Sequence, residues 1–219
     1  MSCLLLDGVP IKYNFIESML AKYHYINSCG AEESIMNESL KTILAFNQEF
    51  VEGRKYEPYL TSKFPDKKYV ILTCMDTRLI ELLPASMNIK NGDVKIIKSA
   101  GGIVNTPFGG IMRSILIAIY ELGASEVFVI GHHDCGMSSV NPERVKKKFI
   151  ERGIKQDTID IIEYSGMNLE RWLRGFDDVR ESVRGSVNLI RNHPLIPDIP
   201  VHGLVIDPAT GKLDVIVEG

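Results

Sequence analysis

The sequence has no apolar run that approaches the roughly 20 residues a membrane-spanning helix needs. The leucines at 4–6 are followed at once by Asp7 and Gly8, and no basic segment precedes them, so we expect no secretion signal. Positive charge is not in excess either, because 25 Lys and Arg stand against 28 Asp and Glu. These absences argue against a membrane protein and a nucleic-acid-binding surface, and they favour the cytoplasm.

Cysteine is also scarce, with four residues among 219, at positions 3, 29, 74 and 135. So few thiols do not build a disulfide framework, and we interpret Cys3 and Cys29 as incidental. The one basic run, at 146–148, is typical of the solvated face of a helix. With 45% hydrophobic residues, the chain can bury one substantial core, as a single α/β domain does.

Hydrophobic periodicity predicts strands that alternate with helices. The expected strands are 69–73, 94–98, 127–130, 201–206 and 213–217. The expected helices are 34–52, 79–86, 110–122, one that begins at Pro142, and one that runs from about 179 to 190. This alternation predicts an α/β fold with a mostly parallel central sheet covered by helices on both faces. We expect an N-terminal arm over 1–33 and one domain over 34–219.

Two short segments follow buried strands and carry most of the chemically active side chains. The first is Cys74-Met75-Asp76-Thr77-Arg78, and the second is His132-His133-Asp134-Cys135-Gly136. In open parallel sheets, ligands bind beyond the carboxyl ends of the strands, at the point where the strand order reverses. The two segments lie far apart in the sequence, as in an enzyme site that folding assembles and unlike a zinc finger.

Two thiols and one imidazole make three protein ligands, the pattern of a catalytic zinc site with a fourth position open to water. We therefore predict that Cys74, His132 and Cys135 bind zinc; the last two, three residues apart, can reach one ion. In extended backbone, Asp76 and Arg78 point to the same side and can form a bidentate pair. The guanidinium would keep the carboxylate ionised, so that it orients the reactive water.

The pair of motifs, C-x-D-x-R and G-H-x-x-C-G, resembles that of the β-class carbonic anhydrases. The resemblance runs from the 34–52 helix to the C-terminus and includes Ala100-Gly101-Gly102. It implies reversible hydration of carbon dioxide to bicarbonate, by attack of hydroxide on one Zn²⁺ per subunit. It also implies four parallel strands plus an antiparallel edge strand, and a homodimer or dimer of dimers in which the N-terminal helix packs on the partner. In a closed state, Asp76 would be the fourth ligand.

Two other functions stay open at this point. Relatives with the same zinc site hydrolyse carbonyl sulfide or carbon disulfide, and pocket shape would decide between these substrates. The alternative from another class is a catalytically silent zinc-binding protein. The intact pair of Asp76 and Arg78 argues against it, because a structural zinc has no use for an orienting carboxylate.

Several neighbouring residues admit plain structural interpretations. His133 is either a proton shuttle or an exposed neighbour without a role, and Asp134 is either functional or only a turn or capping residue. His193 reads as a helix-end residue. Lys98 and Ser99 stand where family members often carry Arg and Asn, which leaves substrate preference open. The loop at 103–109 is particular to this chain and is expected to shape the substrate pocket or a dimer cleft.

Overall fold

The computed structural model describes residues 37–219, and the chain divides into two compact units, Met1–Pro58 and Tyr59–Gly219. In the described part of the first unit, helix α2 covers Glu38–Glu52, and Asn37 caps it by accepting a hydrogen bond from the Ser39 amide. The predicted helix started at residue 34. The expected arm at 1–33, with Cys3 and Cys29, lies outside the described residues, so that boundary stays a prediction.

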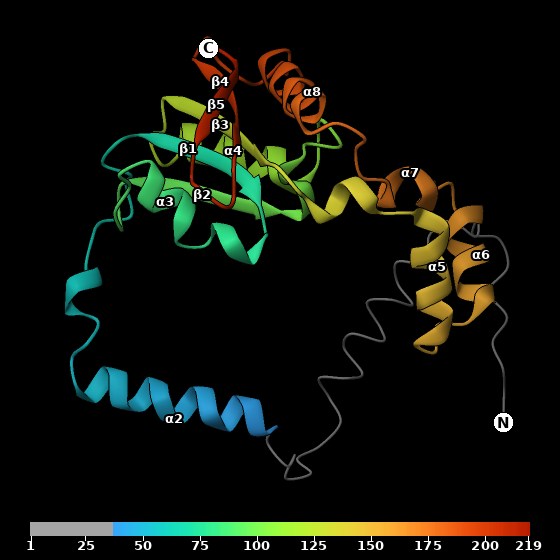
Figure 1. The fold of residues 1–219 in the computed structure, drawn as a ribbon, viewed down its shortest axis with the longest axis horizontal. Helices are drawn as coiled ribbons and strands as arrows, with labels where there is room; N and C mark the ends of the chain where they lie inside the picture. The colour runs from blue at the N-terminus through green and yellow to red at the C-terminus, as the bar shows by residue number, and fades with distance from the viewer. Residues whose placement is uncertain (1–36) are drawn as a thin grey trace, which may run out of the picture. The chain divides into compact units, whose positions relative to one another are not determined.

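The second unit is built on a five-stranded sheet with the order β2-β1-β3-β4-β5 (Figure 1). Its strands are β1 (Tyr69–Cys74), β2 (Val94–Ser99), β3 (Glu126–His132), β4 (Val201–Ile206) and β5 (Leu213–Val217). The first four strands pair in parallel, and β5 pairs with β4 in antiparallel fashion at the edge. The prediction of four parallel strands and one antiparallel edge strand is confirmed.

Helical segments connect the strands, and the first of them, Glu57–Tyr59, spans the boundary between the two units. The 3₁₀ segments are η1 (Glu57–Tyr59), η2 (Thr77–Leu79), η3 (Ala100–Gly102) and η4 (Gly136–Ser139). The α-helices are α3 (Leu82–Ser86), α4 (Gly110–Tyr120), α5 (Pro142–Glu151), α6 (Gln156–Tyr164), α7 (Leu169–Leu173) and α8 (Val179–Arg191). Within residues 37–219, no helix is long and apolar enough to span a bilayer.

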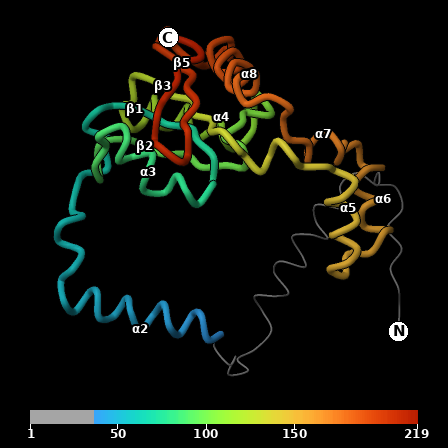
Figure 2. The backbone as a smooth tube through the Cα atoms, viewed as in Figure 1, coloured from blue at the N-terminus to red at the C-terminus, as the bar shows by residue number. Residues whose placement is uncertain are grey.

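Two helices were not predicted from the sequence, α6 and α7. They are short, and each buries a single apolar residue, Ile159 in α6 and Leu169 in α7. So few core positions leave no clear helical periodicity. Figure 2 shows that α5, α6 and α7 form a group of their own before the chain returns to the sheet in α8.

Helices cover both faces of the sheet, as predicted. On one face, α4 and α8 bury side chains such as Ile115 and Val187 against Val70 and Val129 of the strands. On the other face, Leu79 of η2 and Leu83 of α3 pack on Ile71 and its neighbours. Because strand side chains alternate, β1 supplies Val70 and Leu72 to the first core and Ile71 to the second.

The order of the strands reverses around β1. From β1 the chain crosses to β2 through α3 on one face, and then returns past β1 to β3 through α4 on the other face. The carboxyl ends of β1 and β3 therefore lie side by side at a topological switch point. Close packing of α8 fixes this edge, since a Cβ on Gly131 would lie 2.8 Å from the Val179 side chain.

Candidate metal centre and active site

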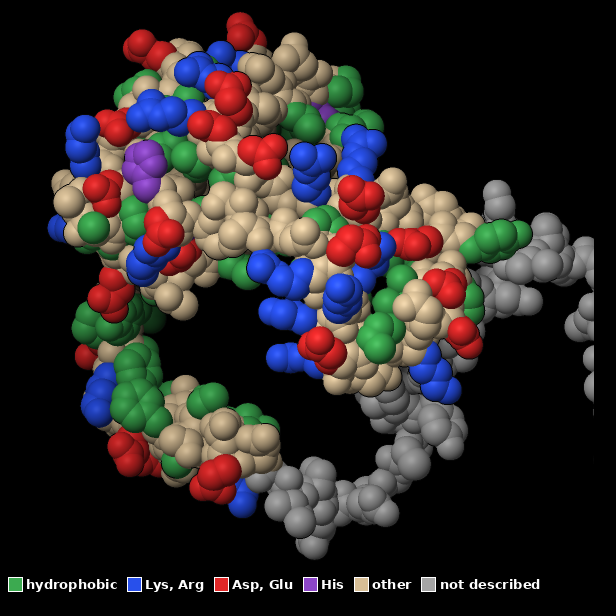
Figure 3. Space-filling view, turned by 45° about the vertical axis from the view of Figure 1, so that its right-hand side comes forward, with side chains coloured by type: hydrophobic (Ala, Val, Ile, Leu, Met, Phe, Trp, Pro, Cys, Tyr) green, Lys and Arg blue, Asp and Glu red, His purple; other side chains and the backbone are tan. Residues whose placement is uncertain are grey.

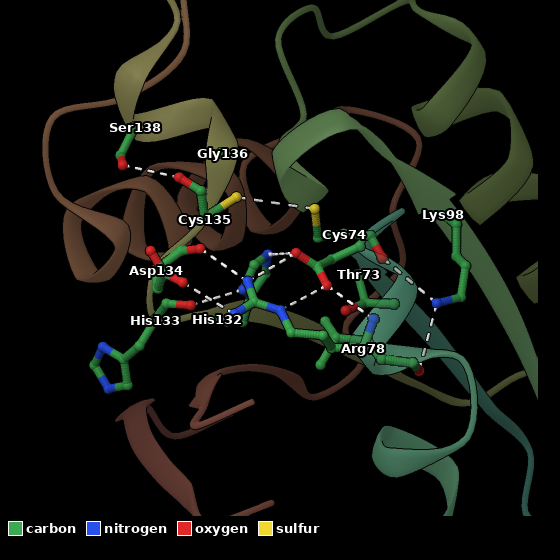
Figure 4. Close-up of polar contacts among 12 residues, drawn as sticks. Thr73, Cys74, Arg78, Lys98, His132, His133, Asp134, Cys135, Gly136 and Ser138 are labelled. Carbon is green, nitrogen blue, oxygen red and sulfur yellow. Dashed lines mark hydrogen bonds and ion pairs between the residues drawn. The ribbon is translucent and has the colours of Figure 1, made fainter. Parts of the chain in front are cut away.

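Three possible metal ligands converge at this switch point. Cys74 ends β1, His132 ends the neighbouring strand β3, and Cys135 lies three residues further on, just before η4. Their ligand atoms all lie within 4.8 Å of one another, and all three residues are buried. The parallel pairing of Thr73 with Ile130 brings the two strand ends together. Figure 4 shows both sulfur atoms and the imidazole in one cluster.

The geometry of these groups fits a tetrahedral metal ion. The Cys74 and Cys135 sulfur atoms are 3.9 Å apart. Two thiolates bound to one tetrahedral zinc at the usual bond length would lie about 3.8 Å apart. His132 Nδ1 is 2.8 Å from the carbonyl oxygen of His133, which only accepts, so Nδ1 carries the proton. Nε2 is then unprotonated in the neutral ring, as a metal ligand must be.

His132 Nε2 is also one of the few buried polar side-chain atoms without a hydrogen-bond partner among the described residues. A buried orphan of this kind calls for an explanation, and a metal ion supplies one. Burial also raises the pKa of the Cys135 thiol to about 11 in the metal-free protein. A metal ion bound here would displace that proton, because thiolate is the ligand form.

Asp76 and Arg78 form the predicted pair. The Asp76 Oδ1 atom accepts hydrogen bonds from Arg78 Nε (3.0 Å) and from the Arg78 amide (2.9 Å), and Oδ2 accepts one from Nη2 (2.9 Å). The side-chain hydrogen bonds are the largest cause of two pKa shifts. They lower the pKa of Asp76 to about 2, and they raise the pKa of Arg78. Asp76 Oδ2 lies 3.7 Å from His132 Nε2. An ionised carboxylate thus lies beside the three ligand atoms.

The local backbone differs from the one we used to predict these contacts. We placed Asp76 and Arg78 on an extended strand, but β1 ends at Cys74, and Asp76 caps the 3₁₀ turn η2 that contains Arg78. We also compared the spacing of His132 and Cys135 to a helical turn. Cys135 in fact has extended backbone angles, and Asp134 before it has a φ of +51°. The side chains meet as expected because the turns fold back.

Asp134 makes a contact that the sequence did not predict. Its Oδ2 accepts a hydrogen bond from Arg78 Nη1 (3.0 Å), and its main-chain oxygen accepts one from Nη2 (2.9 Å). We had interpreted Asp134 as functional or as a turn residue. One sequence signal could have indicated this contact. Asp134 lies between His132 and Cys135, and pairing of the two strands brings that segment close to Arg78.

The backbone around Cys74 is held by neighbours from β2 and η3. Gly102 has a φ of +64°, and a Cβ there would lie 3.0 Å from both the Cys74 nitrogen and the Thr73 carbonyl carbon. Lys98 Nζ donates to the carbonyl oxygens of Cys74 and Leu79 at 3.5 Å. The Lys98 that replaces the expected arginine therefore still contacts the ligand loop.

Other predicted residues lie outside the ligand cluster. The ring of His133 points away from it in Figure 4. Ser99 Oγ is buried without a hydrogen-bond partner, and His193 is buried against the ring of Phe108, with 5.1 Å between centroids. Arg78 also lines an open hollow of about 610 Å³ with Thr77, Ile80, Glu81, Leu82 and Ala85.

Comparisons with known proteins agree with this site. A sequence profile described as carbonic anhydrase matches residues 69–213. The Bacillus subtilis (strain 168) protein named "Putative carbonic anhydrase YtiB" is 61% identical over 181 residues, 82% of this chain and 97% of the relative. A carbon disulfide hydrolase from Acidianus sp. (strain A1-3) is 31% identical over 161 residues, 68% of this chain and 76% of the relative.

The solved structures include a close match as well. β-Carbonic anhydrase isoform I (TvaCA1) from Trichomonas vaginalis superposes with a TM-score of 0.75 at 37% identity, over 84% of this chain and 100% of that one. The matched residues 69–213 include both motifs and all three residues of the ligand cluster. The chain therefore belongs to the β-class carbonic anhydrase family of enzymes.

Proposed function

We propose that the protein catalyses the reversible hydration of carbon dioxide to bicarbonate, with one Zn²⁺ per subunit held by Cys74, His132 and Cys135. One observation carries this proposal above the others. Two thiols and an unpartnered imidazole nitrogen meet at the ends of two strands, beside a carboxylate that an arginine holds ionised. Three protein donors are the pattern of a catalytic zinc site, and the nearby Asp76 carboxylate is engaged by Arg78.

Zn²⁺ at this position would lower the pKa of a bound water to about 7 and so supply hydroxide at neutral pH. The Asp76 carboxylate, with a pKa of about 2, accepts a hydrogen bond and orients the water that attacks carbon dioxide. Arg78 keeps both carboxylate oxygens in place through its three hydrogen bonds. Because these bonds occupy the carboxylate, they favour the open arrangement over the one in which Asp76 is itself a ligand.

Hydrolysis of carbon disulfide or carbonyl sulfide is the second candidate. The relative from Acidianus is named carbon disulfide hydrolase and covers two thirds of this chain. These substrates are linear and apolar like carbon dioxide, so the same oriented water can attack their central carbon. The silent zinc-binding alternative is disfavoured by the intact pair of Asp76 and Arg78.

Stopped-flow measurement of carbon dioxide hydration tests the proposal, on full-length protein of measured zinc content. Carbonyl sulfide and carbon disulfide are assayed in parallel. We expect zinc near one equivalent per subunit and carbon dioxide as the fastest substrate. Stoichiometric zinc with no turnover of any of the three substrates would favour the silent alternative, and faster carbon disulfide turnover would favour the second candidate.

We further propose a homodimer or dimer of dimers in the cytoplasm. The apolar residues of α2 support assembly, because Leu40, Ile43, Leu44 and Val51 are all close to half exposed or more. Figure 3 shows apolar side chains on the surface of this helix.

A further inference from the structure

Asp134 lies in the second motif, and the proposed reaction does not use it. It sits between His132 and Cys135, and both of its oxygen contacts are to Arg78 of the first motif. Arg78 Nη1 donates to Asp134 Oδ2 (3.0 Å), and Nη2 donates to the Asp134 main-chain oxygen (2.9 Å). Figure 4 shows the guanidinium lying between the two motifs. These two bonds therefore join the loop after β1 to the loop after β3.

The guanidinium is fixed on its other side as well. Its Nε and Nη2 groups donate to Asp76 Oδ1 and Oδ2, and Asp76 is only two residues from Cys74. One planar side chain thus bridges two carboxylates, one from each ligand loop. A planar guanidinium transmits orientation between its partners better than a flexible ammonium group would.

The backbone at Asp134 also departs from ordinary geometry. Its φ of +51° lies in the left-handed region, which aspartate tolerates better than most residues. Such a conformation persists where surrounding contacts hold it. At Asp134 the bond from Arg78 to the main-chain oxygen is one such contact. The loop that carries His132 and Cys135 is thus held by the same side chain that holds Asp76.

We propose that Asp134 is a positioning residue that acts through Arg78: it holds the loop of His132 and Cys135 against the loop of Cys74, so that the three donors converge before a metal ion binds. The inference rests on the proposed function, which assigns these donors to Zn²⁺. Without this bridge, the binding energy of the ion would have to order the two loops. Outer-shell contacts of this kind commonly change metal affinity.

The test measures Zn²⁺ affinity of the full-length, metal-free protein by competition with a chromophoric chelator. Asp134→Gly removes the carboxylate and also gives the loop more backbone freedom, while the main-chain acceptor remains. The Asp134 side chain is 87% exposed, so we expect about threefold weaker binding. Asp134→Asn tolerates the left-handed backbone and keeps a neutral acceptor, so it should lose less, about twofold. Glu181→Gln removes the same charge from an exposed pair with Arg184 on α8, and it should leave the affinity unchanged.

The same substitution made in an Arg78→Ala variant separates a positioning role of Asp134 from direct attraction between its carboxylate and the metal ion. In Arg78→Ala protein, adding Asp134→Gly should cause no further loss of affinity. The same loss in Arg78→Ala protein as in wild type would show that the carboxylate acts without Arg78, and it would overturn the positioning role. Equal affinities of wild type and Asp134→Gly would overturn it as well, while tight wild-type binding left the proposed function standing. A wild-type chain that bound no Zn²⁺ would refute both.

Discussion

At the scale of single residues, the site depends on which atoms are left without partners. Among residues 37–219, only three buried polar side-chain atoms lack a hydrogen-bond partner, Ser99 Oγ, His132 Nε2 and His193 Nε2, whereas Thr73, for example, donates to the carbonyl of Ile130. His132 Nε2 has no partner, although its other nitrogen is fixed by a carbonyl oxygen. The imidazole nitrogen and the two thiol sulfur atoms lie within 4.8 Å of one another, so the three groups could hold a metal ion without rearrangement.

Replacement of Asp76 by Asn separates catalysis from metal binding. Asparagine keeps the size of the side chain but loses the negative charge. That charge pairs with Arg78 and strengthens the hydrogen bond that the side chain accepts from the reactive water. We expect carbon dioxide hydration to fall about 100-fold or more, with zinc content unchanged. Stopped-flow rates and metal analysis on the same samples check this. Equal rates in Asp76→Asn and wild type would support the silent zinc-binding alternative; Asp177→Asn, an exposed carboxylate paired with Arg174, is the control.

The affinity for zinc should rise with pH. Burial raises the pKa of the Cys135 thiol from 9.0 to about 11 in the metal-free protein, so at neutral pH a metal ion must displace this proton. The apparent affinity should rise at least about tenfold per pH unit between pH 6 and 8. Chelator competition across this range measures it, and a constant affinity would contradict the expectation. Cys135→Ser should weaken the pH dependence.

The same thiol also affects folding of the metal-free chain. Its folded pKa lies above the unfolded value, so its contribution to stability is complete below pH 9.0 and is lost as the pH rises toward 11. Urea unfolding of metal-free protein across this interval should therefore show falling stability. Metal-loaded protein holds the thiolate already and should lack this particular loss.

At the scale of elements, the strand ends are positioned by close backbone packing. η3 lies against the end of β1 because Gly102 has no side chain, and α8 lies against β3 for the same reason at Gly131. These contacts place Cys74 and His132 on neighbouring strands with little freedom. The site is thus built on the rigid part of the fold, and its loops are short.

Gly102→Ala tests this packing. The new Cβ would combine a left-handed backbone with contacts of 3.0 Å to the β1 backbone, where nothing flexible can yield. Gly123→Ala is the matched control, since its φ is +74° and nothing lies within 4 Å. We expect the control to lose about 1 kcal/mol and Gly102→Ala clearly more, with lower zinc affinity. Urea unfolding measures both, and equal losses would count against the close approach.

At the scale of the whole molecule, the described residues leave α2 with an unburied apolar surface. None of its residues is buried, although Ile43 and Phe46 are apolar and more than 60% exposed. Burial of such a surface is a main driving force for association. The apolar side chains of α2 are therefore candidates for contact with a second copy of the chain.

Ile43→Glu should shift the protein toward smaller species. Gln48→Lys introduces a charge on α2 at a position that is already polar, where the lysine can still donate to Glu52, and it should leave assembly unchanged. Sedimentation velocity at several protein concentrations distinguishes the two variants. If Ile43→Glu sedimented as the wild type does, α2 would not contribute to assembly.

The sequence predicted a helix or strand wherever the apolar residues of that segment repeat at helical or strand spacing. The strands that became β4 and β5 were predicted with their observed bounds, because their alternating or continuous apolar residues end at turn-forming residues. Helices α6 and α7 were missed, because Ile159 and Leu169 alone do not make an apolar stripe. Their stability depends on neighbours that the local sequence does not reveal.

The sequence by itself determined which residues are the candidates, because Cys74, Asp76, Arg78, His132 and Cys135 have a chemistry and a spacing that few other sites share. Only the tertiary structure decided how Arg78 divides its donors between Asp76 and Asp134, and which nitrogen of His132 faces the thiols. The physical reason is directional. A hydrogen bond depends on the donor–acceptor distance to within a few tenths of an ångström and on its angle. Both are set by turn geometry and by packing between strands that are distant in the chain.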